Sequence, residues 1–255
     1  MNATNEINVL KPEATDLRRI GLELYFLCVP LIALSAYLMD TRIMTCVIVG
    51  NLALRFALLG RRADWIFLLI GVVAGGGNDL MSMLKGVYFY TPPSLLKQYG
   101  APIPIWMLLY WGHIFVSVRQ PFQLPVFQGE PPAGSPWKID RRLIADIIVV
   151  VAFRIIIYNT VQNEPWPTIG FASVLVLRLL AIPPKKHEWL LIAAVMLLGP
   201  PFEAALIGFG LYVYFDPILG GMPAWLLSYW IFALPLLLTG LFDRREGGLA
   251  REKAT

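Results

Sequence analysis

Long, mostly apolar runs constrain this chain more than any other feature of its sequence. Residues 143–157, 168–182 and 225–242 are examples, and charged residues make up only 15% of the chain, against about a quarter in soluble domains. An apolar stretch of about 20 residues spans the hydrocarbon core of a bilayer. Backbone groups in lipid must be satisfied within helices or closed barrels. Because period-two alternation is missing, we predict an all-α integral membrane protein.

The same pattern predicts about eight transmembrane helices, separated midway by a proline-rich linker. The predicted helices span residues 20–39, 43–60, 65–85, 103–118, 143–161, 168–182, 189–211 and 223–242. The predicted organisation is a cytoplasmic N-terminal segment (1–18), a first four-helix repeat (19–118), a linker (119–141), a second four-helix repeat (142–243) and a basic tail (244–255).

The basic residues test this helix count. With eight spans, Arg42, Lys85 and Lys97 fall on one side, whereas the other lysines and arginines outside the helices lie on the side of the termini. The positive-inside rule then predicts that both termini are cytoplasmic. Compact loops favour a bacterial inner membrane. The formal charge of +4 reflects these helix-end residues, so it is no signal for nucleic acid.

The two halves also resemble one another. Several chemically similar residues recur with an offset of 124 positions: Trp65/Trp189, Asp79/Glu203, Gly86/Gly210, Tyr88/Tyr212, Tyr90/Tyr214 and Pro93/Pro217. We interpret this as an internal duplication. Because each repeat has an even number of helices, the repeats would run parallel about a pseudo-twofold axis along the membrane normal.

Asp79 and Glu203 are the predicted catalytic residues. Each lies roughly 21 Å along a helix, from the rise of 1.5 Å per residue, and a carboxyl group at that depth usually faces inward and has a function. Each follows a helix-breaking stretch, at 75–77 or 199–201. The acids either cap half-helices that begin there or meet at a site between broken helices. Facing one another, one would act as general acid and the other as base.

Arginines inside helices form a second set of candidates. Arg154 lies near the middle of its helix, where we expect it to pair with Asp146, Asp79 or Glu203, or to bind an anionic group of the substrate. With Asn78, it would orient the two acids.

The other arginines and acids within predicted helices lie closer to the membrane surface. Arg55 and Arg178 are expected to extend their side chains to that surface. Glu23 and Asp146 are expected to be charges at helix N-termini.

Aromatic side chains complete the predicted site. Trp106 and Trp225 suit an interfacial aromatic belt, but the deeper rings could line a cavity and stabilise a cation. His113 could shuttle protons or simply bond to a neighbour. The candidate substrate-binding residues are Asn78, Tyr88, Tyr90, Tyr110, Trp111, His113, Arg154, Tyr212, Tyr214, Tyr229 and Trp230.

Several catalytic signatures are missing from the sequence. It has no Gly-x-x-x-x-Gly-Lys, Gly-x-Ser-x-Gly, His-Glu-x-x-His or Cys-x-x-Cys, and no pair of Asp-rich motifs that would chelate magnesium. Nucleotide use, serine hydrolysis and zinc chemistry are therefore disfavoured. We expect neither a metal nor a cofactor.

Part of each half resembles a known superfamily. An intramembrane acid (Asp79), an aromatic pair (Tyr88 and Tyr90) and a Pro-x-Trp at Pro104 are similar to the emopamil-binding-protein superfamily with its EXPERA relatives. They also look similar to the small membrane-bound terpene cyclases of fungal meroterpenoid pathways. The resemblance implies a compact helical enzyme with an essential acid in each half. The His and Glu pattern of the sterol isomerases is not matched here.

The sequence thus favours a membrane enzyme that performs cyclisation, isomerisation or hydration on an isoprenoid or other lipid-soluble substrate. Two alternatives stay open. A proton-coupled transporter or channel would use the paired acids as its coupling site. A structural subunit would bind a membrane-complex partner, and a homo-oligomer is also possible.

Overall fold

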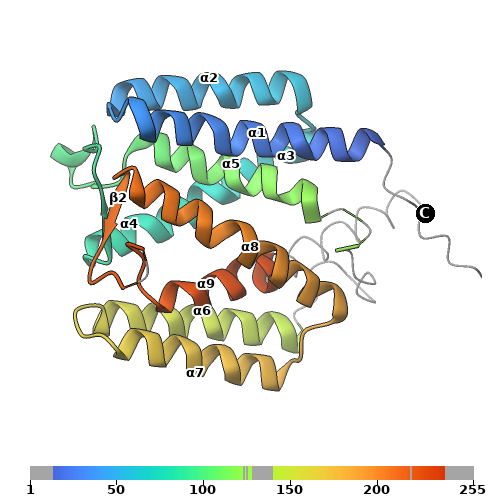
Figure 1. The fold of residues 1–255 in the computed structure, drawn as a ribbon, viewed down its shortest axis with the longest axis vertical. Helices are drawn as coiled ribbons and strands as arrows, with labels where there is room; N and C mark the ends of the chain where they lie inside the picture. The colour runs from blue at the N-terminus through green and yellow to red at the C-terminus, as the bar shows by residue number, and fades with distance from the viewer. Residues whose placement is uncertain (1–13, 123, 125, 128–139, 219, 239–255) are drawn as a thin grey trace, which may run out of the picture.

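The computed structural model describes residues 14–122, 124, 126–127, 140–218 and 220–238, and these residues form a mostly helical fold (Figure 1). The first half contains α1 (Ala14–Tyr37), α2 (Thr41–Leu59), α3 (Arg62–Ile70), η1 (Gly71–Gly75), α4 (Gly76–Leu84), β1 (Tyr88–Tyr90), η2 (Lys97–Tyr99) and α5 (Ile105–Phe122). The second half contains α6 (Arg141–Thr160), α7 (Trp166–Ala181), α8 (Lys186–Gly208), β2 (Tyr212–Tyr214), α9 (Trp225–Phe232) and η3 (Ala233–Leu238).

Five helical segments in the described part of the chain are long and apolar enough to cross a membrane. They are Leu17–Tyr37, Thr41–Leu59, Asp64–Leu84, Arg141–Thr160 and Lys186–Gly208, and Trp166–Ala181 and Trp225–Leu237 are shorter apolar helices. The length and apolar composition of these segments confirm the prediction of a multi-pass helical membrane protein. The count of eight spans stays a prediction. The N-terminal 13 residues, most of the linker and the basic tail lie outside the described residues.

The helices are arranged so that two pairs enclose a central group. In Figure 1 the α1–α2 pair lies at one edge and the α6–α7 pair at the opposite edge, with α5, α8 and α9 between them. Helix α2 packs on α5 as α7 packs on α9, and α3 packs on α5 as α8 packs on α9. The central group therefore faces both outer pairs.

The stretches at 75–77 and 199–201 do not break their helices, contrary to the sequence-based expectation. Helix α3 continues into the π-helical turn η1 and then α4, with Gly75 and Gly76 both in the right-handed helical region. Helix α8 runs through Pro200 and Pro201, because membrane helices tolerate proline where neighbouring groups satisfy the freed backbone groups. A full break in lipid would also leave backbone groups unpaired. The prediction that the acids cap half-helices is therefore wrong.

Two glycines in these helices permit close contact with tryptophan rings. A Cβ atom at Gly75 would lie 2.5 Å from the ring of Trp111, and one at Gly199 would lie 2.6 Å from the ring of Trp230. Both distances are far below van der Waals contact. Glycine at these positions lets Trp111 of α5 pack directly against Gly75, and Trp230 of α9 pack directly against Gly199.

A small antiparallel ribbon departs from the all-α prediction. Strands β1 and β2 pair with Tyr88 opposite Tyr214 and Tyr90 opposite Tyr212. Each strand follows a glycine with positive φ, Gly86 or Gly210, a conformation that commonly ends a helix. Because side chains alternate along a strand, all four tyrosines share one face of the ribbon.

Candidate functional site

A cavity of about 320 Å³ lies inside the bundle and brings most of the predicted site residues together. Its size falls within the range of small-molecule pockets, and its wall is mostly apolar. Both acids line it. Among the predicted substrate-binding residues, those on its wall are Asn78, Tyr88, Tyr90, Tyr110, Trp111, Arg154, Tyr212, Tyr214, Tyr229 and Trp230.

Asp79 is held by two tyrosine hydroxyls of β1. Its side chain is on α4 and the residue is only 2% exposed. Tyr88 donates a short hydrogen bond to Oδ1, and Tyr90 donates one to Oδ2 at 2.7 Å. Both carboxyl oxygens are thus satisfied by side chains rather than by helix amides.

Glu203 has the corresponding arrangement on α8 and β2. The Tyr214 hydroxyl donates to Glu203 Oε1 at 2.7 Å, and Tyr212 also interacts with this carboxyl group. Glu203 and Asp79 interact electrostatically. The ribbon therefore links two carboxyl groups that face one cavity, and tyrosine hydroxyls surround both of them.

Arg154 points to the same cavity from α6. Its Nη1 and Nη2 lie 3.4 Å from Ser82 Oγ and Tyr229 Oη, and its guanidinium lies over the rings of Tyr158 and Tyr229. The predicted pairing with Asp146 is wrong, because Asp146 Oδ1 accepts instead from Arg178 Nε at 2.8 Å. Arg154 does interact with the charge of Asp79.

Two tryptophans assigned to an interfacial belt are buried instead. Trp106 is 0% exposed and packs edge-on against Tyr90. Trp225 lines the cavity and contacts Phe171 and Tyr214. The belt prediction fails because both rings pack against tyrosines of the ribbon inside the protein.

His113 is buried but does not line the cavity, and its role in substrate binding stays a prediction. Its ring packs edge-on against Tyr110, which does line the cavity, and the Tyr110 hydroxyl donates to the Leu27 carbonyl. Within the described residues, neither ring nitrogen of His113 has a hydrogen-bond partner. In the same part of the chain, no group of three or more His, Cys, Asp and Glu side chains is arranged to hold a metal ion.

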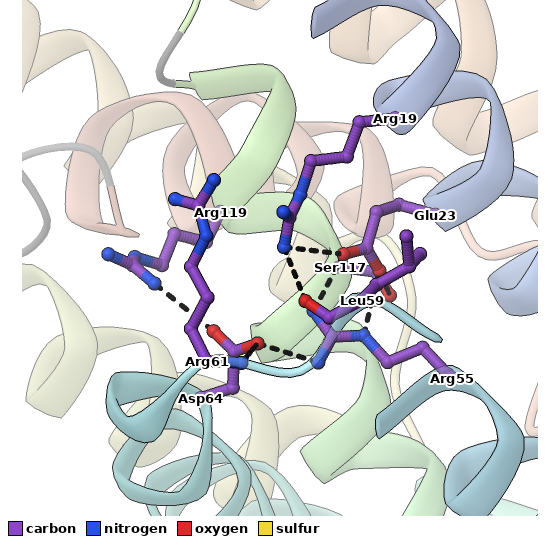
Figure 2. Close-up of polar contacts among 8 residues, drawn as sticks. All are labelled: Arg19, Glu23, Arg55, Leu59, Arg61, Asp64, Ser117 and Arg119. Carbon is purple, nitrogen blue, oxygen red and sulfur yellow. Dashed lines mark hydrogen bonds and ion pairs between the residues drawn. The ribbon is translucent and has the colours of Figure 1, made fainter. Parts of the chain in front are cut away.

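A separate buried ion network lies at the α2–α3 turn (Figure 2). Arg55 is 0% exposed and pairs with Glu23 at 2.6 Å and with Asp64 at 2.7 Å. Ser117 donates to Glu23, and Arg119 pairs with Asp64 at 3.2 Å. The expectation that Arg55 reaches the membrane surface is therefore wrong, because paired acids satisfy its charge inside the bundle.

A related network occurs in the second half. Arg178 pairs with Asp146, and Arg142 pairs with both Asp146 and Glu188. The two networks have matched positions, Glu23/Asp146 and Arg55/Arg178, each separated by 123 residues. Sequence reasoning treated these charges singly. The signal that could have found the networks is the shared spacing of 32 residues within each acid–arginine pair.

Comparisons with known proteins provide fold-level information. No protein-family model matches the chain, and no curated protein matches it significantly. The crystal structure of a mycobacterial Insig homolog from Mycobacterium vanbaalenii is similar in fold, with a TM-score of 0.54 and 17% sequence identity. The match covers 72% of this chain and 94% of the homolog. It supports a membrane-protein fold and gives no evidence for the EXPERA or cyclase families.

Proposed function

We propose that this membrane-embedded protein is an enzyme that performs acid–base chemistry on an isoprenoid or other lipid-soluble substrate. The observation that carries the proposal is the pair of carboxyl groups, Asp79 and Glu203, on the wall of one largely apolar cavity. Carboxyl groups in the interior of a membrane protein are costly and usually functional. An apolar cavity with a few convergent polar groups is the usual form of a small-molecule site.

The arrangement suits proton transfer to and from carbon. One carboxyl group would donate a proton to a double bond of the substrate, and the other would accept a proton from the resulting cation, or from water that attacks it. Cyclisation, isomerisation and hydration all fit this scheme. The rings of Tyr229, Trp111 and Trp230 would stabilise the cation through their π faces.

The groups around the two acids would set their roles. Tyr88 and Tyr90 donate to Asp79, and Tyr214 and Tyr212 are the corresponding partners of Glu203. Hydrogen bonds to a carboxylate favour its charged form. The nearby positive charge of Arg154 acts on Asp79 and favours its ionised form, so we assign Asp79 to the role of base. Glu203 is then the general acid.

The proposal includes an internal duplication and a topology. The element order helix, helix, helix, strand, helix recurs in both halves, and the ion networks recur with the same spacing. These features support two parallel four-helix repeats. The distribution of basic residues along the sequence supports eight spans with cytoplasmic termini, and we propose a bacterial inner membrane as their location. The two acids would then be equivalent residues brought together by the pseudo-twofold axis.

The test is mass spectrometry of small molecules that co-purify with the protein in mild detergent. Wild type, Asp79→Asn and Glu203→Gln are compared, with Asp40→Asn as a control at an exposed helix cap. A specific isoprenoid or other lipid that accumulates in both amide variants, but not in the control, is the expected result. The same bulk phospholipids in all four samples would contradict the proposal. Proton-dependent uptake in proteoliposomes would then favour a transporter.

A further inference from the structure

We propose that the ligand of this cavity carries a neutral, hydrogen-bond-accepting oxygen, such as a carbonyl or ester oxygen, which binds Arg154. The inference rests on the proposed function in that it concerns the same cavity, and it specifies the chemical class of the ligand. It predicts an amphipathic lipid with one polar group rather than a pure hydrocarbon.

The first argument comes from positions at which the two halves differ. The acids match in polarity, as do the tyrosines of the ribbon. At three other pairs of equivalent positions on the cavity wall, one residue is polar and its counterpart is apolar. The pairs, with the polar residue first, are Asn78 and Phe202, Ser82 and Leu206, and Arg154 and Leu31. The first two pairs have the offset of 124 that relates the acids, and the third has the offset of 123 that relates the ion networks.

The polar members of these pairs lie together. Arg154 Nη1 is 3.4 Å from Ser82 Oγ, and the Ser82 hydroxyl donates to the backbone carbonyl of Asn78, one turn earlier on α4. The counterparts Leu31, Phe202 and Leu206 are all apolar. The cavity therefore has one polar region around Arg154, in addition to its pair of acids. This polarity would orient an amphipathic ligand in a single direction.

The guanidinium of Arg154 has donors to spare. Arginine has five N–H donors and no acceptor. Arg154 interacts with Ser82, Tyr229 and Tyr158, and its hydrogen bonds to Ser82 and Tyr229 are long, at 3.4 Å each. Among the described residues, no carboxyl group lies within ion-pair distance of it, whereas Arg55 has two below 3 Å and Arg178 has one. A ligand that uses these donors must present an acceptor, and oxygen is the ordinary choice.

The charges around the cavity favour a neutral acceptor. Arg154 already interacts electrostatically with Asp79, and Glu203 interacts with Asp79 as well. The cavity wall thus carries one guanidinium and two carboxyl groups. A ligand with its own negative charge would be repelled by whichever acid is ionised, and that repulsion is weakly screened inside a membrane protein. A carbonyl or ester oxygen accepts hydrogen bonds without adding charge.

The experiment measures binding of three probes that share one branched saturated chain and cannot react: phytane, phytanic acid and methyl phytanate. A shift in the wavelength of tryptophan emission reports occupancy, because Trp111, Trp225 and Trp230 line the cavity. Wild type should bind the ester more tightly than the hydrocarbon by roughly tenfold or more, the effect of a hydrogen bond to a charged donor. The acid, ionised at neutral pH, should bind more weakly than the ester.

Matched variants assign this preference to one residue. Arg154→Leu, which copies Leu31 of the first half, should bind ester and hydrocarbon equally, whereas Arg154→Lys should keep part of the preference. Arg42→Leu, at an exposed position, should behave as wild type. An unchanged ester preference in Arg154→Leu, or tighter binding of the acid than of the ester in wild type, would overturn the inference. Binding by Asp79→Asn separates this result from catalysis, because that variant should lose turnover but keep the ester preference.

Discussion

Tyr88 and Tyr214 lie opposite one another in the β1–β2 ribbon, and each donates a hydrogen bond to the acid of its own half. Their ring centroids are 5.2 Å apart. Asp79 and Glu203 are therefore coupled through a pair of strands that joins residues more than 120 positions apart. The ribbon is small, but it positions both carboxyl groups on one cavity.

The first prediction concerns these hydroxyl groups. Tyr88→Phe and Tyr214→Phe each remove one donor to an acid while keeping the ring that packs in the core. We expect turnover to fall about tenfold in each, the effect of losing one hydrogen bond to a charged group, with little change in thermal unfolding. Tyr37→Phe, at an exposed position, serves as the control. Unchanged turnover in both variants would show that the hydroxyl groups do not tune the acids.

The second prediction concerns the glycine–tryptophan contacts. A methyl group at Gly75 or Gly199 would overlap the ring of Trp111 or Trp230. Gly75→Ala and Gly199→Ala should therefore lower the free energy of unfolding by about 1–3 kcal/mol, as overpacking does, and should shift tryptophan emission. Gly77→Ala, where the new methyl group meets nothing within 4 Å, should be neutral or stabilising. Equal stability of all three variants would contradict the close packing described here.

Most helix boundaries could be predicted from the sequence to within a few residues, and there is a physical reason for this. Spans such as α2 and α6 are bounded by polar residues, and aspartates cap both of them: Asp40 and Asp140 accept from the first amides of each helix. Local chemistry therefore sets these boundaries. The offset of 124 also singled out Asp79 and Glu203 as a pair, and both line the cavity.

The features that sequence reasoning missed depend on tertiary contacts. The Tyr-x-Tyr segments pair only because two turns, distant in sequence, meet in space. Arg55 seemed close enough to the surface to reach water, but its partners Glu23 and Asp64 come from α1 and α3. The proline and glycine runs looked like helix breaks, because propensities measured in water exaggerate the effect of these residues in a membrane helix.

The third prediction concerns the ion network of Figure 2. Arg55→Met leaves Glu23 and Asp64 buried without their shared partner, which should cost about 3–5 kcal/mol of stability. The triple variant Glu23→Gln, Arg55→Met, Asp64→Asn removes all three charges and should be more stable than Arg55→Met alone. Thermal unfolding in detergent measures both, with Arg42→Met as an exposed control. A triple variant less stable than the single one would show that the charges themselves stabilise the fold.

The fourth prediction concerns topology. Cys28 and Cys46 are first replaced by serine, and single cysteines are then introduced as Lys97→Cys or Lys185→Cys, both exposed positions. With eight spans and cytoplasmic termini, a membrane-impermeant thiol reagent should label Lys97→Cys in intact cells and Lys185→Cys only after the cells are opened. Labelling of both from one side would contradict the predicted number of spans between them.

The central claim is proton transfer from a carboxyl group to the carbon skeleton of a lipid, and solvent deuterium measures it most directly. Purified protein is incubated in D₂O with the lipid that co-purifies with it, or with a total lipid extract, and the products are analysed by mass spectrometry. We predict that wild type incorporates carbon-bound deuterium into a specific lipid, and that Asp79→Asn and Glu203→Gln do not. Incorporation at the wild-type rate in both amide variants would contradict the account.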